Sequence, residues 1–287
     1  MLIFLRSWWR FSSAGLAIVL SASGYLSHAQ KLPPGCRLPF AEIAGEHKID
    51  TTCGFGGDAE AGPHQEQNKA KNNFCAGQGR APIPVQYKTF IDLQKAAQKM
   101  KDSGKLPFGS SKSLPKDRKI LEEMLSAGGS KIGEGSVVRV VAFVIDARNS
   151  GKESVNCGQT GNENNDIHID LGMKSSDDAC KSITAEMSPH FRPLTWARIT
   201  NKRVHHDLIQ HPVRVTGHLF FDASHAPCRN GTRPFPNRAS IWEIHPVYAF
   251  DVCRNGTLGT CGAGDESVWT PLDKWVEKFE KSAEEEP

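Results

Sequence analysis

The middle of the chain alternates apolar and polar side chains with a period of two, which places every second residue on the same face of a β-strand. Segments 166–171, 182–187, 213–222 and 240–252 are predicted strands on this pattern, and a run dominated by β-branched residues predicts another strand over 137–145. A short helical pattern over 194–199 separates the third strand from the fourth. Three strands, a helix and two more strands is the order of the OB-fold. The chain is therefore predicted to be mainly β with added helices, and residues 136–253 to form an OB-fold-like five-stranded barrel.

Residues 30–135 precede the predicted barrel, and the stretch from 30 to about 80 is rich in glycine, proline, asparagine and cysteine. They are expected to form a Cys-containing, irregular and partly helical N-terminal region. A short helix is expected over 65–74. Thr89 is expected to cap a second helix, and Ser113 a third one that ends near residue 128.

Residues 254–287 follow the predicted barrel and are expected to be a C-terminal extension with one helix. Thr270 suits the cap of that helix and Pro271 its first turn. The apolar residues that recur at helical spacing are Leu272, Trp275, Val276 and Phe279. This stripe is expected to dock the helix on the barrel.

The first residues of the chain have the pattern of an export signal. Arg6 and Arg10 flank an aromatic stretch, an apolar run covers 14–20, and small residues lead to Ala29. The run is shorter than the ~20 residues that cross a bilayer, which favours a cleaved signal peptide over residues 1–29 rather than a membrane anchor. The protein is therefore expected to be secreted or periplasmic, with no transmembrane segment after cleavage.

Signal cleavage changes the charge balance. The whole chain has 35 basic and 32 acidic residues, a net charge of +3, and 33 basic and 32 acidic residues remain after residue 29. A nearly neutral chain lacks the strong basic coat with which proteins bind nucleic acid non-specifically. A function must therefore come from where the charges are placed.

All eight cysteines lie after the predicted signal peptide, and none is spaced as a CxxC pair. An even number of cysteines in an exported chain favours disulfides over zinc sites. Proximity in the sequence favours a bond between Cys157 and Cys180, which flank the second predicted strand.

Side chains of the kind that ligate metals stand on the polar faces of the predicted strands. Asp166 and His168 belong to the second strand, Glu186 to the third, and Glu243 and His245 to the fifth. A spacing of two places the carboxylate and the imidazole on the same side of a sheet. We expect these groups to converge if the strands share one curved face.

The convergence predicts a divalent-metal hydrolase that acts on phosphodiesters. The predicted metal ligands are Asp166, His168, His225 and His245. Glu186 or Glu243 would activate water, and Arg192 would stabilise the developing charge. A mixed set of histidine and carboxylate ligands suits Zn²⁺ or Mn²⁺ better than Ca²⁺.

Glu153 and Asn156 lie in the loop between the first two predicted strands, a usual ligand-contacting rim of OB-folds, and are the predicted ligand-binding residues. Simpler interpretations stay open at this point. The polar strand residues could form a solvated face, Arg192 could pair with Glu186, and Asn156 could only order its loop beside a disulfide.

The chain has no nucleophile elbow, HExxH motif, phosphate-binding loop or dinucleotide fingerprint. Whether it is an enzyme is therefore an open question. The alternative to a hydrolase is a non-catalytic module that binds a glycan, an oligonucleotide or a protein, or an envelope scaffold with a hydrated polar face. The expected partner is a small or polymeric ligand of unknown identity, and no pattern indicates an oligomeric state.

Three strings in the predicted barrel resemble a group of uncharacterised exported bacterial proteins: ESVNC at 153–157, NDIHI at 165–169 and SIWEIHP at 240–246. The resemblance covers residues 136–253 and extends faintly to KNNFC at 71–75. It supports an OB-fold-like domain and implies no activity. Secreted OB-folded nucleases offer an analogy for a site of carboxylates and arginine, at the level of the fold alone.

Overall fold

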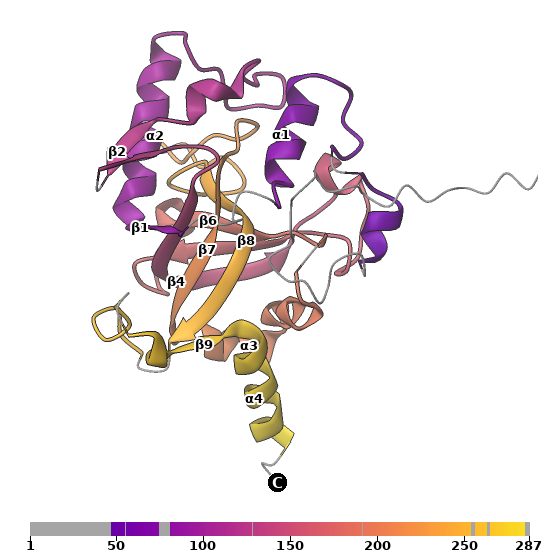
Figure 1. Ribbon diagram of the computed structural model, residues 1–287, viewed down its shortest axis with the longest axis vertical. Coiled ribbons are helices and arrows are strands. Elements are labelled where there is room, and N and C mark those ends of the chain that lie inside the picture. The colour runs from indigo at the N-terminus through magenta and orange to yellow at the C-terminus, as the bar shows by residue number, and fades with distance from the viewer. Residues whose placement is uncertain are drawn as a thin grey trace, which may run out of the picture.

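Five strands close into a barrel in the computed structural model, which describes residues 47–284 apart from 55, 75–80, 128, 191, 254–255 and 263–264 (Figure 1). The barrel strands are β4 (Val137–Asn149), β5 (Ile167–Gly172), β6 (Ile183–Met187), β7 (Pro212–Phe221) and β8 (Trp242–Cys253). β4 pairs with β5 and β7, β5 pairs with β6, and β8 pairs with β7 and, in parallel, with β6. The prediction of a closed five-stranded barrel is confirmed, and the predicted signal peptide lies outside the described residues.

β4 closes the barrel because its 13 residues are long enough to pair with two neighbours. Its first half, from Val137 to Phe143, pairs with β7, and its second half pairs with β5. The register with β5 shifts between Val144 and Asp146. An irregularity of this kind bends a strand and increases its twist, which allows the sheet to curl around the core.

The apolar face of each strand lies in the main core. On β5, Ile167, Ile169 and Leu171 are fully buried in that core, and His168 and Asp170 alternate with them. The polar residues therefore point out of the barrel. The alternation found in the sequence assigned the two faces of this strand correctly.

Two short strands extend the barrel sheet among the described residues. β1 (Ile83–Val85) runs parallel to β4, and β9 (Trp269–Pro271) pairs with the end of β8. Another pair forms a separate hairpin: β2 (Leu125–Ala127) and β3 (Ser130–Ile132).

The helix predicted from Ser113 to residue 128 is wrong. A 3-10 turn, Arg118–Leu121, and the strand β2 occupy that segment. The hairpin brings Glu134 back to the Arg118 guanidinium, with Nε 2.7 Å from Oε2. These contacts between distant residues outweigh the local helical pattern.

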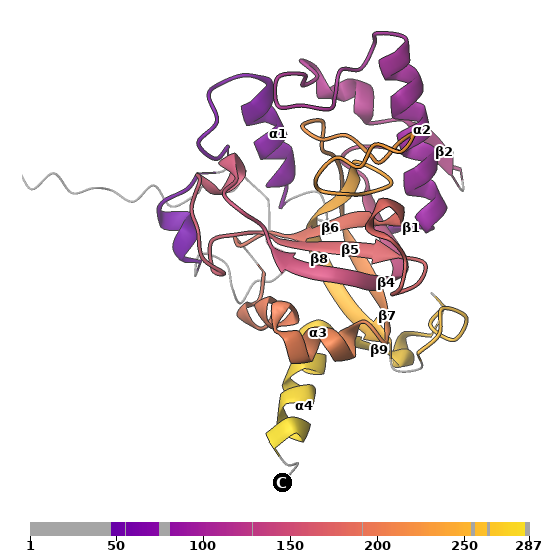
Figure 2. The same cartoon turned by 180° about the vertical axis from the view of Figure 1, so that it is seen from behind.

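The α-helices of the described residues are α1 (Pro63–Lys71), α2 (Tyr87–Asp102), α3 (Lys202–Leu208) and α4 (Leu272–Glu284). Gln86 caps α2, and Thr89 completes a capping box from the third helical position instead of acting as the cap. Figures 1 and 2 show α1 and α2 at one end of the barrel and α3 and α4 at the other. None of these helices is both long and apolar enough to cross a membrane.

Three disulfides join the described cysteines: Cys53–Cys157, Cys180–Cys228 and Cys253–Cys261. The predicted bond between Cys157 and Cys180 is wrong. These two residues flank the six-residue strand β5, whose ends lie ~20 Å apart at the usual rise of a strand. Cys36 and Cys75 lie outside the described residues.

Two of these bonds hold the loops at the α1 end of the barrel. Cys53–Cys157 ties the segment before α1 to the β4–β5 loop (150–166), and Cys180–Cys228 ties the turn before β6 to the β7–β8 loop (222–241). α1 bridges the same two loops. Asn68 Nδ2 donates to Ser154 Oγ at 3.1 Å, and Gln67 Nε2 donates to Asp222 Oδ1 at 3.3 Å.

Candidate metal centre and pocket

The outward faces of β5, β6 and β8 are polar, yet α1 and the two loops cover them. His168 and Glu186 are 5% and 4% exposed, and Glu243 and His245 are fully buried. A solvated polar face is thus excluded as an explanation of the alternation in these strands. Buried ionisable groups need partners or a ligand, so this covered face is the natural place to look for chemistry.

Asp166, Glu186 and His245 form a compact group in which one ligand atom from each residue lies within 4.8 Å of the others. His245 Nδ1 is 3.0 Å from Glu186 Oε2, and His245 Nε2 is 3.9 Å from Asp166 Oδ2. β6 and β8 create this proximity because they run in parallel with Ala185 beside Ile244, which makes Glu186 and His245 neighbours. Asp166 joins them from the last position before β5.

Three buried polar atoms of this group have no hydrogen-bond partner among the described residues: both oxygens of Asp166 and Nε2 of His245. Buried polar atoms are almost always satisfied in folded proteins. Two carboxylates and an imidazole within this distance are ligand types that divalent cations bind in proteins. The residues present therefore fit a divalent cation.

The charges of the group already depend on one another. Burial raises the pKa of Asp166 to about 6. Burial alone would lower the pKa of His245, but the nearby carboxylates of Glu186, Glu243 and Asp166 raise it well above its usual value. The protonated ring of His245 is thus a positive charge that balances the carboxylates. A bound divalent cation would supply this positive charge in place of the proton on His245.

His168 holds Glu186 in position. Its Nδ1 lies 2.9 Å from Glu186 Oε1 and its Nε2 lies 3.1 Å from Asp170 Oδ1, so both ring nitrogens are engaged. Burial would lower the pKa of His168, yet its hydrogen bonds to Asp170 and Glu186 raise it to about 9. The sequence prediction made His168 a metal ligand, whereas the structure places it beside the compact group.

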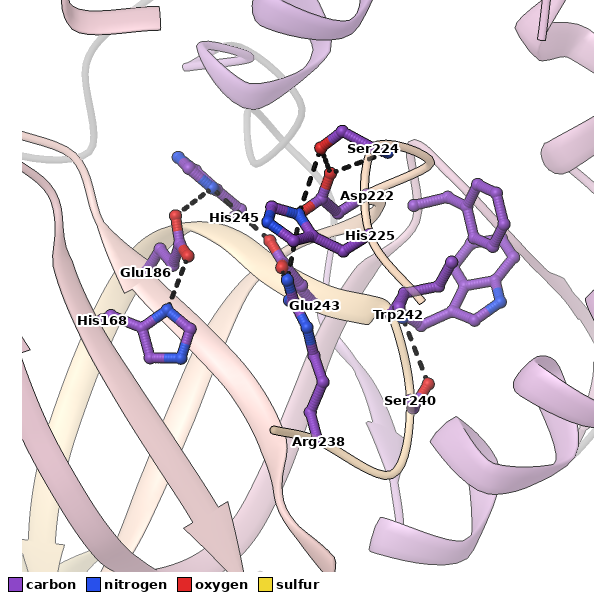
Figure 3. Close-up of polar contacts among 12 residues, drawn as sticks. His168, Glu186, Asp222, Ser224, His225, Arg238, Ser240, Trp242, Glu243 and His245 are labelled. Atoms are coloured by element: carbon purple, nitrogen blue, oxygen red, sulfur yellow. Dashed lines mark hydrogen bonds and ion pairs between the residues drawn. The ribbon is translucent and has the colours of Figure 1, made fainter. Parts of the chain in front are cut away.

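Arg238 and Asp222 form a second buried pair next to Glu243. Arg238 contacts Glu243 through Nη1 and lies 3.2 Å from Asp222 Oδ2 through Nη2 (Figure 3). Asp222 Oδ2 is also 2.5 Å from His225 Nδ1. Burial would raise the pKa of Asp222, but His225, Lys71 and Arg238 hold it well below its usual value. His225, another predicted metal ligand, is therefore the partner of an ionised carboxylate.

Lys71, at the end of α1, inserts its ammonium group among the acidic side chains. Its Nζ lies 3.1 Å from Glu153 Oε2 and 3.8 Å from Glu186 Oε2. Burial would lower the pKa of Lys71, but Glu153, Glu186 and Asp222 keep it well above its usual value. The ammonium group therefore stays charged and balances part of the negative charge of these carboxylates.

The sequence analysis missed Lys71 and Arg238, although one signal was present. α1 has the sequence PHQEQNKAK, in which alanine is the only apolar residue apart from the initial proline. Its buried residues are Gln67, Asn68 and Lys71. A helix that buries polar side chains must cover a polar surface. Arg238 gave no comparable signal because it stands in an irregular loop.

Arg192 and Asn156 lie in other places than predicted. Arg192 Nη1 donates to the carbonyl oxygens of Asn165 and Met187 at 2.7 and 2.8 Å, which braces the backbone next to Asp166. These contacts replace the ion pair with Glu186 that the sequence left open. Asn156 is fully buried, and neither residue is among those that line the pocket described next.

A pocket of about 610 Å³ opens over this face, between α1 and the two loops. His168 and Glu186 contribute to its lining, together with Lys71 from α1 and Glu153 from the β4–β5 loop. The β7–β8 loop contributes Asp222, Ser224, His225, Phe235, Pro236 and Arg238. Asp166 and His245 lie behind Glu186, so the compact group borders the pocket through Glu186.

Comparisons with protein-family models, with curated proteins and with solved structures found no match.

Proposed function

We propose that the barrel is an OB fold and that the protein is a metal-dependent phosphodiester hydrolase. The topology supports the first part: β4, β5, β6, β8 and β7 follow one another around the ring, the third and fifth strands are parallel, and helical residues join the third strand to the fourth. The pocket lies beside strands β5 and β6, between the β4–β5 and β7–β8 loops, where OB folds place their ligands.

One observation carries the hydrolase proposal. Asp166, Glu186 and His245 are buried and bring ligand atoms within 4.8 Å of one another, and both oxygens of Asp166 and Nε2 of His245 have no hydrogen-bond partner among the described residues. We assign these three residues as the ligands of Zn²⁺ or Mn²⁺. A divalent cation at this position supplies Lewis acidity toward a phosphoryl oxygen and toward water.

His225 supplies proton transfer in this proposal. The carboxylate of Asp222 holds His225 Nδ1 at 2.5 Å, which fixes the ring and leaves Nε2 for a group in the pocket. The His225 side chain is 37% exposed, so it can reach both a substrate and solvent. A histidine oriented by a carboxylate is a common general acid and base in enzymes. The sequence analysis gave this role to Glu186 or Glu243, but Glu243 is fully buried against Arg238.

Lys71 and Arg238 provide positive charge around the reaction site. Lys71 lines the pocket with its Nζ 3.8 Å from Glu186 Oε2, and Arg238 lines it from the β7–β8 loop. Fixed cations of this kind stabilise negative charge that develops on a phosphoryl group, because they need no reorganisation during the reaction.

The test is hydrolysis of bis(p-nitrophenyl) phosphate by metal-free protein to which Mn²⁺ or Zn²⁺ is added. Asp166→Asn keeps the shape of the side chain and removes a charged ligand, so we expect kcat/KM to fall by about a hundred-fold or more. Asp102→Asn, at an exposed position on α2, is the matched control and should keep full activity. Equal activity of the two variants, or wild-type protein inactive with every divalent cation, would contradict the proposal.

A non-catalytic binding module is the second candidate function. Its support is that the main charges around the pocket already neutralise one another, as in the pairs of Lys71 with Glu153 and Arg238 with Glu243. This candidate predicts that the protein binds a ligand without turning it over. Binding that survives Asp166→Asn, together with no hydrolysis by the wild-type protein, would favour it.

A further inference from the structure

Phe235 lines the pocket and is unusually exposed to solvent for a phenylalanine. Its relative exposure is 85%, the highest among the large apolar residues that the structure describes. The other exposed ones are Ile120, Met173 and Leu194, and none of them lines this pocket. An aromatic ring left in water beside a pocket has a free face on which a planar group can stack.

The loop that carries Phe235 is held in place. Cys228 is bonded to Cys180, Arg233 Nη2 lies 2.9 Å from both carboxylate oxygens of Asp178, and Arg233 Nε donates to Asn237 Oδ1 at 3.1 Å. The ring is therefore presented by a fixed loop, and binding on it requires little ordering of the backbone.

Positive charge lies across the pocket from this loop. Lys152, in the β4–β5 loop, is exposed, lines the pocket and makes no ion pair with any described residue. Arg148 also lines it, with its side chain 33% exposed and its guanidinium shared between Asp146 and Asp170. A free ammonium group suits a backbone phosphate, and the ring of Phe235 suits a base.

We propose that the substrate is single-stranded nucleic acid, with one base stacked on Phe235 and a neighbouring phosphate held by Lys152. This inference rests on the proposed phosphodiester hydrolysis and names its substrate class. Single strands are favoured over duplexes because only an unpaired, unstacked base exposes a face to the ring. A glycan would also stack on an aromatic ring, but the unpaired Lys152 favours an anionic polymer.

The experiment measures binding separately from chemistry. A short fluorescein-labelled oligothymidylate is titrated with the full-length protein in a chelator, and anisotropy gives Kd. Stacking of a base on an aromatic side chain is worth about 1–3 kcal/mol, so Phe235→Ala is expected to raise Kd about ten-fold. Phe235→Trp should restore the affinity. Leu194→Ala, at a residue 75% exposed outside the pocket, is the matched control and should leave Kd unchanged.

Two further comparisons complete the test. Lys152→Ala should raise Kd several-fold and make it less sensitive to salt, because one phosphate contact is lost. The same oligonucleotide annealed to its complement should bind more weakly than the single strand. Equal Kd values for Phe235→Ala and wild type, equal binding of duplex and single strand, or binding of a neutral glycan in place of the oligonucleotide would overturn the inference. Tight, Phe235-dependent binding without any hydrolysis would retain the ligand class and overturn the hydrolase proposal alone.

Discussion

α1 and α4 cover opposite ends of the same barrel with opposite chemistry. α4 buries Leu272 and Val276 completely and packs Trp275 and Phe279 against the main core. α1 buries Gln67, Asn68 and Lys71 against charged side chains of the barrel. The α4 end is held by apolar area removed from water. The α1 end is held by ion pairs and hydrogen bonds, and it is the end where a pocket and a potential metal centre occur.

This difference predicts unequal responses to substitution at the two ends. Loss of an apolar contact should reduce stability and leave the site intact in the folded protein. Removal of one charged side chain at the α1 end should leave its partner buried without a counter-ion, which lowers the free energy of unfolding.

The largest effect is expected for Arg238→Met. The substitution removes the cation that contacts both Glu243 and Asp222, and all three side chains are at most 2% exposed. Breaking a buried ion pair from one side costs about 3–5 kcal/mol. Urea denaturation of the wild type and the variant measures the loss. Arg233→Met, which breaks a half-exposed pair with Asp178, is the control and should cost less than about 1 kcal/mol.

Leu272→Ala should have the next largest effect, at the apolar end. Leu272 is fully buried, and truncation of a buried leucine to alanine costs about 3 kcal/mol through lost transfer free energy and the cavity left behind. The same urea titration applies. Metal binding by the folded variant should equal that of the wild type, and a parallel loss of metal binding would show that the two ends are not independent.

Lys71→Met is expected to destabilise the protein by about 2 kcal/mol, less than Arg238→Met because its partner Glu153 keeps 27% of its side chain exposed. The variant removes the ammonium group beside Glu153 and Glu186 and so leaves excess negative charge there. A bound divalent cation would offset that charge, so added Mn²⁺ should recover part of the lost stability, as followed by thermal unfolding. A loss that Mn²⁺ does not change would separate Lys71 from the metal centre.

The smallest effect concerns pH and Asp170. Burial would raise the pKa of Asp170, but its hydrogen bond with His168 and the charge of Arg148 hold it below its usual value. A carboxyl with a depressed folded-state pKa contributes stability above its unfolded-state pKa and loses that contribution as the pH falls through the folded-state value. Asp170→Asn should therefore cost about 1 kcal/mol at pH 7 and show a shallower loss of stability below pH ~4. Unfolding curves from pH 2 to 7 test this, and identical pH profiles would contradict it.

The barrel could be predicted from the sequence because the alternation of apolar and polar residues is a local signal. Four of the five strands and both faces of β5 follow from it, and the β-branched run at 137–145 indicates the first strand. The same signal placed Glu186 and His245 on polar faces, and with Asp166 they form the compact group. Periodicity does not show whether a polar face is exposed to solvent or covered by another segment of the chain. α1, which buries Gln67 and Lys71 over it, decides that question.

Contacts between segments that lie far apart in the sequence could not be predicted from it. Cys157 bonds to Cys53, 104 positions away, instead of to the nearer Cys180. Arg238 lies in an irregular loop with no period, and only the fold brings it to Glu243 and Asp222. His225 has the chemistry of a metal ligand, but its loop directs Nδ1 to Asp222.

Calorimetric titration of chelator-treated protein with Mn²⁺ and Zn²⁺ tests the central claim most directly. If Asp166, Glu186 and His245 hold a divalent cation, the wild-type protein and the Asp102→Asn control should bind one ion per chain with the same affinity. Asp166→Asn should bind it at least about ten-fold more weakly while remaining folded by circular dichroism. Wild-type protein that takes up neither ion, or an Asp166→Asn variant with unchanged stoichiometry and affinity, would contradict the metal centre.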